Sequence, residues 1–195
     1  KKFKENPALL VNWVRTNIKL NPDKHAMRIP QTPISTWESR VADERSRNIF
    51  FVDVARSLGI EAQQDGVTGK VQYKKDGQWV DVDFETTQQQ VAKTGKLVLD
   101  YKPTEFLDDP KYYTHFTISK IVNGQTLLMN FDESADGSTY GATWANAFKD
   151  GATLDEGTYL LVTGQRMADG SVMAHNRFFT IKPGTTTRIN LIMRQ

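Results

Sequence analysis

The sequence predicts an α+β protein in two parts, a helix-plus-sheet unit over residues 1–95 and an all-β unit over residues 96–195. Apolar residues recur at helical three- and four-residue steps up to about residue 60, and at two-residue steps beyond it. From residue 96 onward, short strand-like runs alternate with turn dipeptides. A chain of 195 residues suits one large domain or two small ones, and the change of period favours two.

The first predicted helix begins at Asn6-Pro7, where a capping residue precedes a proline suited to a first helical turn. Apolar residues then recur in helical register from Leu9 to Ile18, which predicts one amphipathic helix. The segment that follows, residues 21–35, holds three of the seven prolines. We therefore expect an irregular connection there.

The second predicted helix, residues 46–58, is apolar over most of its circumference. Such a helix is typical of a domain interior. Asp43 or Ser46 is available as its N-cap, and Gly59 is the expected stop at its C-terminal end.

A β-hairpin is predicted next, because residues 69–75 and 78–85 alternate in period two around the turn dipeptide Asp76-Gly77. The second helix laid on this hairpin would form a compact unit. Residues 86–95 are polar and are expected to form a linker or a short surface helix that ends at Gly95.

The second half of the chain predicts six or seven strands. Two of its hairpins contain turn dipeptides, Asn123-Gly124 and Asp169-Gly170, and residues 143–154 are expected to include one helical turn. This spacing over about 100 residues is typical of a β-sandwich. The strand-like runs are residues 96–103, 112–122, 125–134, 157–167, 171–184 and 185–195.

Composition excludes several classes of function. The 25 basic and 23 acidic residues are interspersed, so no basic stripe predicts binding to nucleic acid. No apolar run approaches the ~18 residues that a membrane span needs. The absence of cysteine excludes disulfides, thiolate metal sites and a cysteine nucleophile. The chain opens abruptly in charged residues, and we expect it to be a piece of a longer protein.

A resemblance appears in the first half, in the order SLGIEA at a helix end, a strand, an Asp-Gly turn and QWVDVDFE. This order resembles the core of the transglutaminase-like (papain-like) superfamily. The resemblance implies a nucleophilic cysteine at the N-terminus of the buried helix, a histidine on the next strand and an aspartate after the turn. A thiolate at a helix N-terminus is stabilised by the helix dipole, and the His–Asp pair controls whether the thiol is protonated.

The family positions fall on Glu44 for the cysteine, Thr68 for the histidine and Asp83 for the aspartate. Only Asp83 matches the family residue. The resemblance therefore implies a degenerate unit. A slip of one or two residues would move the first position to a neighbour: Asp43, Arg45 or Ser46.

Two functions from different classes follow. The first is a non-catalytic unit that acts as a scaffold or as a protein or glycan interaction module. The second is a peptide-directed hydrolase or acyl transferase that uses Asp83 with Ser46 or Thr68, or that is completed by upstream sequence. A hydroxyl needs an adjacent base to become nucleophilic, and His25 is the only histidine in this half. The first function is therefore favoured.

Four arginines, Arg40, Arg45, Arg47 and Arg56, lie close to the second helix in sequence. Ion pairs with nearby aspartates are favoured over an anion-binding site. In particular, a contact of Arg47 or Arg56 with Asp83 would turn the surviving carboxylate into a structural partner.

The second half resembles, through LDEGTYLLVTG, the Asp169-Gly170 turn and FFTIKPGTTTRINL, the prealbumin-like or carboxypeptidase-regulatory-type sandwiches of bacterial extracytoplasmic proteins. Such modules usually pack, space or bind. The resemblance implies a location in the periplasm or at the cell surface, and a peptide, a glycan or other domains of the parent protein as partners. No cofactor is implied.

Candidate ligand residues in this half are aromatic. Tyr140 and Trp144, with Tyr112 and Tyr113, are expected in or beside loops, where their rings could stack on a sugar. Aromatic cover of the sandwich edges is the favoured alternative.

A metal site is not expected in the second half. Residues 132–137 resemble the opening of a calcium loop, but its twelfth position is Thr143 and not the required glutamate. His115 and His175 are isolated on predicted strands and are expected to be structural.

Overall fold

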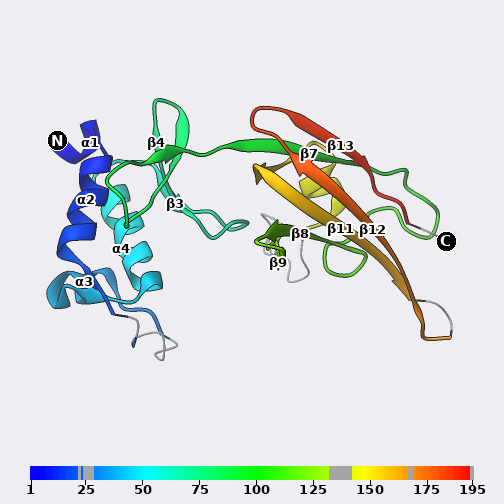
Figure 1. Cartoon of the computed structure of the whole chain (residues 1–195), viewed down its shortest axis with the longest axis horizontal. Helices are drawn as coiled ribbons and strands as arrows, with labels where there is room; N and C mark the ends of the chain where they lie inside the picture. The colour runs from blue at the N-terminus through cyan, green and yellow to red at the C-terminus, as the bar shows by residue number, and fades with distance from the viewer. Residues whose placement is uncertain (22, 24–28, 132–141, 167–168, 194–195) are drawn as a thin grey trace. The chain divides into compact units, whose positions relative to one another are not determined.

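The computed structural model describes residues 1–21, 23, 29–131, 142–166 and 169–193. Helices and several β-sheets are both present, which confirms the α+β class (Figure 1). The chain divides into two compact units, Lys1–Ala92 and Lys93–Gln195. The boundary predicted after residue 95 falls inside strand β7 (Thr94–Asp100) of the second unit.

The two predicted helices of the first unit are present. Helix α2 (Ala8–Asn17) starts after Pro7, and a separate short helix, α1 (Lys2–Glu5), precedes it. Helix α4 (Glu44–Ser57) is capped by Asp43, whose carboxylate accepts the Ser46 N–H at 2.6 Å. Of the two N-caps considered, Asp43 is correct and Ser46 lies within the first turn.

The expected irregular connection over residues 21–35 is wrong at its end, because helix α3 (Pro33–Ser39) starts there. Thr32 caps this helix by accepting the Ser35 N–H at 3.2 Å, and proline occupies the first helical turn. On either side, β1 (Lys19–Leu20) and β2 (Val41–Ala42) form a short parallel pair.

The first unit contains a four-stranded antiparallel sheet in the order β3-β4-β5-β6. The predicted hairpin is its centre, and Asp76 (φ +50°) and Gly77 (φ +78°) both have the positive φ of a type I′ turn. No helix forms over residues 86–95; part of this segment adds a strand to the sheet instead. The strands are β3 (Ala62–Gln64), β4 (Val71–Lys75), β5 (Gln78–Asp81) and β6 (Gln90–Val91).

Helix α4 is buried in the core of the first unit, as its composition predicts. Phe50, Phe51 and Ala55 are almost fully buried, together with side chains of α2 and of the sheet. The Phe51 ring packs edge-on against Phe84, with the ring centroids 5.7 Å apart. This packing fixes the N-terminal turn of α4 next to the segment that follows β5.

The second unit contains two sheets, ordered β10-β7-β13 and β12-β11-β8-β9. The hairpin turn at Asn123-Gly124 is present, with positive φ at both residues. The predicted helical turn is also present, as the π-helical turn η2 (Trp144–Phe148). The remaining strands are β8 (Phe116–Val122), β9 (Gln125–Leu128), β10 (Ala152–Asp155), β11 (Gly157–Arg166), β12 (Val172–Ile181) and β13 (Thr186–Asn190).

Buried aromatic side chains make up much of this second core. Tyr112 is fully buried, and its ring packs against Tyr113, Phe116, Phe131 and Phe148 with centroid distances of 4.4–6.0 Å.

A second tyrosine in this core, Tyr159, donates its hydroxyl to the Asp155 carbonyl at 2.7 Å. Burial, and to a smaller extent the charge of Asp155, raises the pKa of the Tyr159 phenol. It therefore remains a neutral core residue at physiological pH.

None of the helices in the described part of the chain is long and apolar enough to cross a bilayer.

Candidate functional site

The three positions identified through the transglutaminase-like resemblance line one groove in the first unit. Glu44, Thr68 and Asp83 are separated in sequence, but all three border the same hollow of about 550 Å³. The other lining residues are Leu20, Arg47, Asn48, Gly69, Lys70, Val71, Asp81, Val82, Phe84 and Glu85.

Glu44 is the first residue of α4 and is exposed. The N-terminal turn of a helix has a partial positive charge, which stabilises a carboxylate as it would stabilise a thiolate. Glutamate at this position can hold a cation or accept hydrogen bonds. A glutamate here supplies no sulfur nucleophile for acyl transfer.

Thr68 forms part of the turn between β3 and β4. Its N–H and its hydroxyl both donate to the Asp65 carboxylate, at 2.8 and 2.6 Å. The hydroxyl oxygen also accepts the Lys70 N–H at 3.2 Å. These bonds hold Thr68 in the turn. A threonine also has no imidazole with which to accept a proton from a nucleophile.

Asp83 follows β5 and is exposed. Its carboxylate accepts the Glu85 N–H at 2.8 Å, and its own N–H donates to the Gln89 side chain at 2.7 Å. The predicted ion pair between Asp83 and Arg47 or Arg56 is wrong. Arg47 lies 3.5 Å from Glu85, and Arg56 donates to the Ala62 carbonyl at 2.8 Å.

Arg47 is a groove residue that the sequence associated with Asp83, although its contacts differ from those expected. It is only 7% exposed, and its guanidinium lies 4.6 Å from the centroid of the Phe84 ring. Cation–π contacts of this kind are stronger where solvent is excluded. Its position one turn into α4 and next to Phe84 depends on tertiary packing.

Opposite charges meet along the groove, but acids are in excess. Its described lining residues contribute four carboxylates and two cationic side chains. Lys70 pairs with Asp81 at 2.9 Å, and Arg47 pairs with Glu85. Both cations therefore already face an acid, whereas Glu44 and Asp83 take part in none of the ion pairs found among the described residues.

Ser46, the alternative nucleophile, is not a groove residue. It is 1% exposed, and its hydroxyl oxygen accepts the Gln31 N–H at 2.9 Å. This bond ties the connection before α3 to the first turn of α4. His25, the base considered for Ser46, lies outside the described residues.

Of the aromatic candidates that lie among the described residues of the second unit, only Tyr113 is exposed. Trp144 is only 7% exposed, and its indole N–H donates to the Leu99 carbonyl at 2.6 Å. Tyr112 is buried, Tyr113 is partly exposed, and Tyr140 lies outside the described residues. The expectation of exposed rings is therefore wrong for Trp144 and Tyr112, because both complete the core.

Within the part of the chain that the structure describes, no three or more His, Cys, Asp or Glu side chains converge as a metal site. His115 is structural, since its Nδ1 accepts the Lys111 N–H at 2.9 Å. The calcium-like segment, residues 132–137, is outside the described residues.

The described residues of the groove thus offer carboxylates, one amide, a lysine and a buried arginine. The one hydroxyl among them, that of Thr68, donates to Asp65, and no imidazole is present in this described lining. This set of groups is suited to binding. No protein-family model, curated protein or solved structure matches the chain.

Proposed function

We propose that residues 1–92 form a degenerate transglutaminase-like unit that binds a peptide segment in its groove without catalysis. The second unit is a prealbumin-like sandwich that serves as scaffold, and the two belong to a larger bacterial protein of the periplasm or cell surface. The main support is that Glu44, Thr68 and Asp83, the positions that the resemblance implies, line one groove. The location is supported only by the sequence resemblance.

The residues at these positions favour binding over catalysis. Acyl transfer needs a nucleophile, a base within hydrogen-bond reach and a group that orients the base. Asp83 could act only as the third of these, and the Thr68 hydroxyl is held by Asp65. Retention of the groove without the reactive groups is what a binding module derived from an enzyme would require.

The charge of the groove favours a peptide with a basic side chain. Glu44 and Asp83 are exposed carboxylates at the groove, whereas both cations of the lining face an acid. A lysine or arginine of the ligand could pair with these carboxylates while its stem covers Val82 and Phe84. A volume of about 550 Å³ accommodates one or two side chains and leaves the adjoining backbone of the ligand outside.

A binding experiment tests this proposal. Fluorescent peptides identical except for a central Lys, Gln or Glu are titrated with the full chain, and anisotropy is measured at low and high salt. We expect the lysine peptide to bind best and to weaken with salt. The combined change Glu44→Gln and Asp83→Asn should weaken it roughly fivefold, since exposed ion pairs contribute about 0.5 kcal/mol each.

Glu38→Gln is the matched control, because Glu38 is an exposed glutamate of the same unit that does not line the groove. It should leave binding unchanged. Equal affinity for the lysine and glutamate peptides, or an equal loss in the control, would contradict the proposal.

A turnover experiment separates this function from the acyl-transferase alternative. The chain is incubated with a glutamine-bearing peptide and a primary amine, and separately with a cell-wall peptide, and the products are followed by mass spectrometry. We expect no product above background. Repeatable product that disappears in the Ser46→Ala, Asp83→Ala double variant would establish catalysis by non-family residues.

A further inference from the structure

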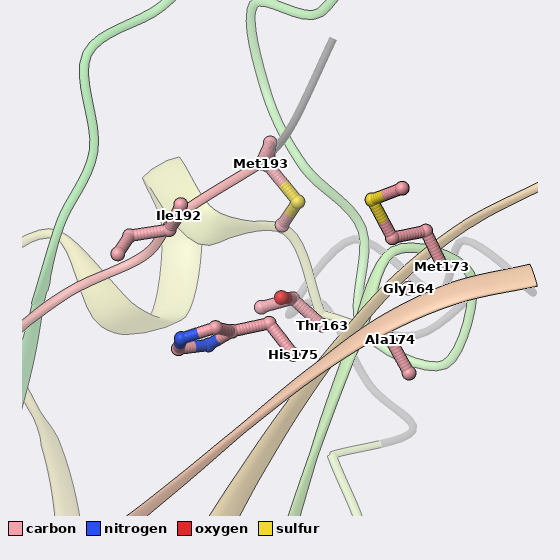
Figure 2. Close-up of a pocket in the computed structure, with 7 residues that line it drawn as sticks. All are labelled: Thr163, Gly164, Met173, Ala174, His175, Ile192 and Met193. Carbon is pink, nitrogen blue, oxygen red and sulfur yellow. The ribbon is translucent and has the colours of Figure 1, made fainter.

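A small pocket in the second unit contains an unusual set of side chains. Its volume is about 100 Å³, well below that of a site for a drug-sized ligand. Figure 2 shows its lining, which comes from β11, β12 and the segment after β13. The lining residues are Thr163, Gly164, Met173, Ala174, His175, Ile192 and Met193.

The two-residue period of a β-strand explains which side chains of β12 form one wall of the pocket. Side chains two residues apart lie on the same face of a strand. Along β12, Phe179 and Ile181 are buried, and continuing their register back along the strand gives the exposed Arg177 and then His175 and Met173. In Figure 2 these last two side chains extend from one side of β12, and the Ala174 side chain points away on the other.

The partner strand confirms which face this is. His175 lies directly opposite Thr163 of β11 in the antiparallel register, and directly opposite residues share a face of the sheet. Thr163 is 4% exposed. The imidazole is therefore on the interior face, near the end of the strand where burial decreases.

The other wall follows from the same alternation. Ile189 and Leu191 are buried in and just after β13, and the next residue in this register is Met193. Met193 is half-buried and lines the pocket. Two thioethers and one imidazole thus line one pocket, from β12 and from the segment after β13.

We propose that Met173, His175 and Met193 form a binding site for a soft monovalent metal ion, Cu(I) or its analogue Ag(I). Thioether sulfur is a soft ligand that selects Cu(I), and imidazole also suits copper. The described residues that line the pocket include no carboxylate, which disfavours the hard cations Ca²⁺ and Mg²⁺. They supply one imidazole, and the chain has no cysteine to supply a thiolate, which disfavours Zn²⁺.

Side-chain flexibility allows the three donors to close on one ion. Methionine has three rotatable bonds beyond its Cα, so its sulfur adapts to a small ligand without movement of the backbone. Ile192 and the methylene groups of the two methionines contribute apolar atoms to the lining, in which Met173 and Ile192 remain exposed. A coordinated ion would then hold the segment after β13 against the end of β12.

Competition with a chelator tests the proposal on the full chain. Cu(I) is supplied with ascorbate in the absence of oxygen, and its transfer from bicinchoninate to the protein is followed by absorbance. We expect one Cu(I) per chain. The Met173→Leu, Met193→Leu double variant should lose at least about tenfold in affinity, because even residues that only support a metal ligand have effects of that size.

Met129→Leu is the control, since Met129 is a buried core residue of the same unit that does not line the pocket. Leucine and methionine have similar volumes, so all three substitutions should preserve the fold. Retention of Cu(I) by the double variant, or failure of the wild-type chain to take Cu(I) from bicinchoninate, would overturn the proposal.

A second measurement needs no variant. The chain contains five methionines, so protein labelled with ¹³C in the methionine methyl groups gives five methyl signals. Addition of Ag(I) should shift the signals of Met173 and Met193 and leave that of Met129 in place. Shifts confined to Met27 or Met167, or identical shifts with Zn²⁺, would show that the ion binds elsewhere or without selectivity and would overturn the assignment.

Discussion

Replacing Tyr112 with alanine is expected to lower the free energy of unfolding of the second unit by about 3–5 kcal/mol, as for other buried aromatic side chains. Tyr112 is fully buried and its ring contacts four other aromatic rings. Its removal leaves a cavity that the rigid rings around it cannot fill. Amide hydrogen exchange of β8 and β11 under native conditions measures this change separately from the first unit.

The phenol oxygen of Tyr112 makes a separate contribution. It accepts the Ile118 N–H at 3.1 Å and lies 2.8 Å from the Met129 carbonyl oxygen. Tyr112→Phe keeps the ring but leaves the Ile118 N–H and the Met129 carbonyl without this hydroxyl as a partner, at a cost of about 1–3 kcal/mol.

Phe106→Ala is the control for Tyr112→Ala, since the Phe106 side chain is 87% exposed and its loss should change stability by less than about 0.5 kcal/mol. Similar effects at positions 106 and 112 would show that the ring cluster does not stabilise the unit.

Gly95→Ala is expected to destabilise the second unit by about 3 kcal/mol, the upper end of the usual range for overpacking. An added Cβ would lie too close to the Lys182 carbonyl oxygen, 2.9 Å from Ile181 Cγ2 and 3.0 Å from the Thr185 carbonyl oxygen. Two of these atoms belong to the backbone, so no side-chain rotation relieves the contact. Thermal unfolding followed by calorimetry measures the effect.

Gly164→Ala is the matched control in the same unit. Its added Cβ would meet only Val172 Cγ1, at an ordinary 3.7 Å. We expect a neutral or slightly stabilising change, because alanine reduces the entropy of the unfolded chain. A stable Gly95→Ala protein would mean that the backbone around residue 95 approaches less closely than the structure indicates.

Local signals in the sequence were sufficient for much of the fold. Asp43 and Gly59 delimit α4 because a side-chain cap and a positive-φ residue act within one turn of the helix. Asp76-Gly77 and Asn123-Gly124 specify hairpins because few other residues tolerate positive φ at both positions. Helix α3 had a comparable signal, Thr32 before Pro33, but the high proline content of the segment favoured a loop.

Features that depend on long-range packing were not predictable. Tyr112 and Trp144 were expected near the surface because they adjoin loops, yet packing between distant segments buries both. Gly95 was expected to end a linker, whereas it allows β7 to approach the backbone near Lys182. In each case the deciding neighbour lies far away in sequence.

The candidate groove was partly predictable. The family resemblance named Glu44, Thr68 and Asp83, and the structure places all three along the groove. The partner of Arg47 was not predictable, because Asp83 and Glu85 are both acidic and near in sequence. Only the direction of the chain after β5 decides that Glu85, and not Asp83, reaches the guanidinium.

The strand order of the second unit also determines when it can form during synthesis on the ribosome. Strand β7 is the first strand of this unit, yet it lies in the middle of its sheet, between β10 and β13, and its pairing with β13 is parallel. A nascent chain would hold β7 without either neighbour until most of the unit had been translated, because such non-local pairing waits for the later strand. The first unit pairs its sheet between successive strands and is free to fold while translation continues.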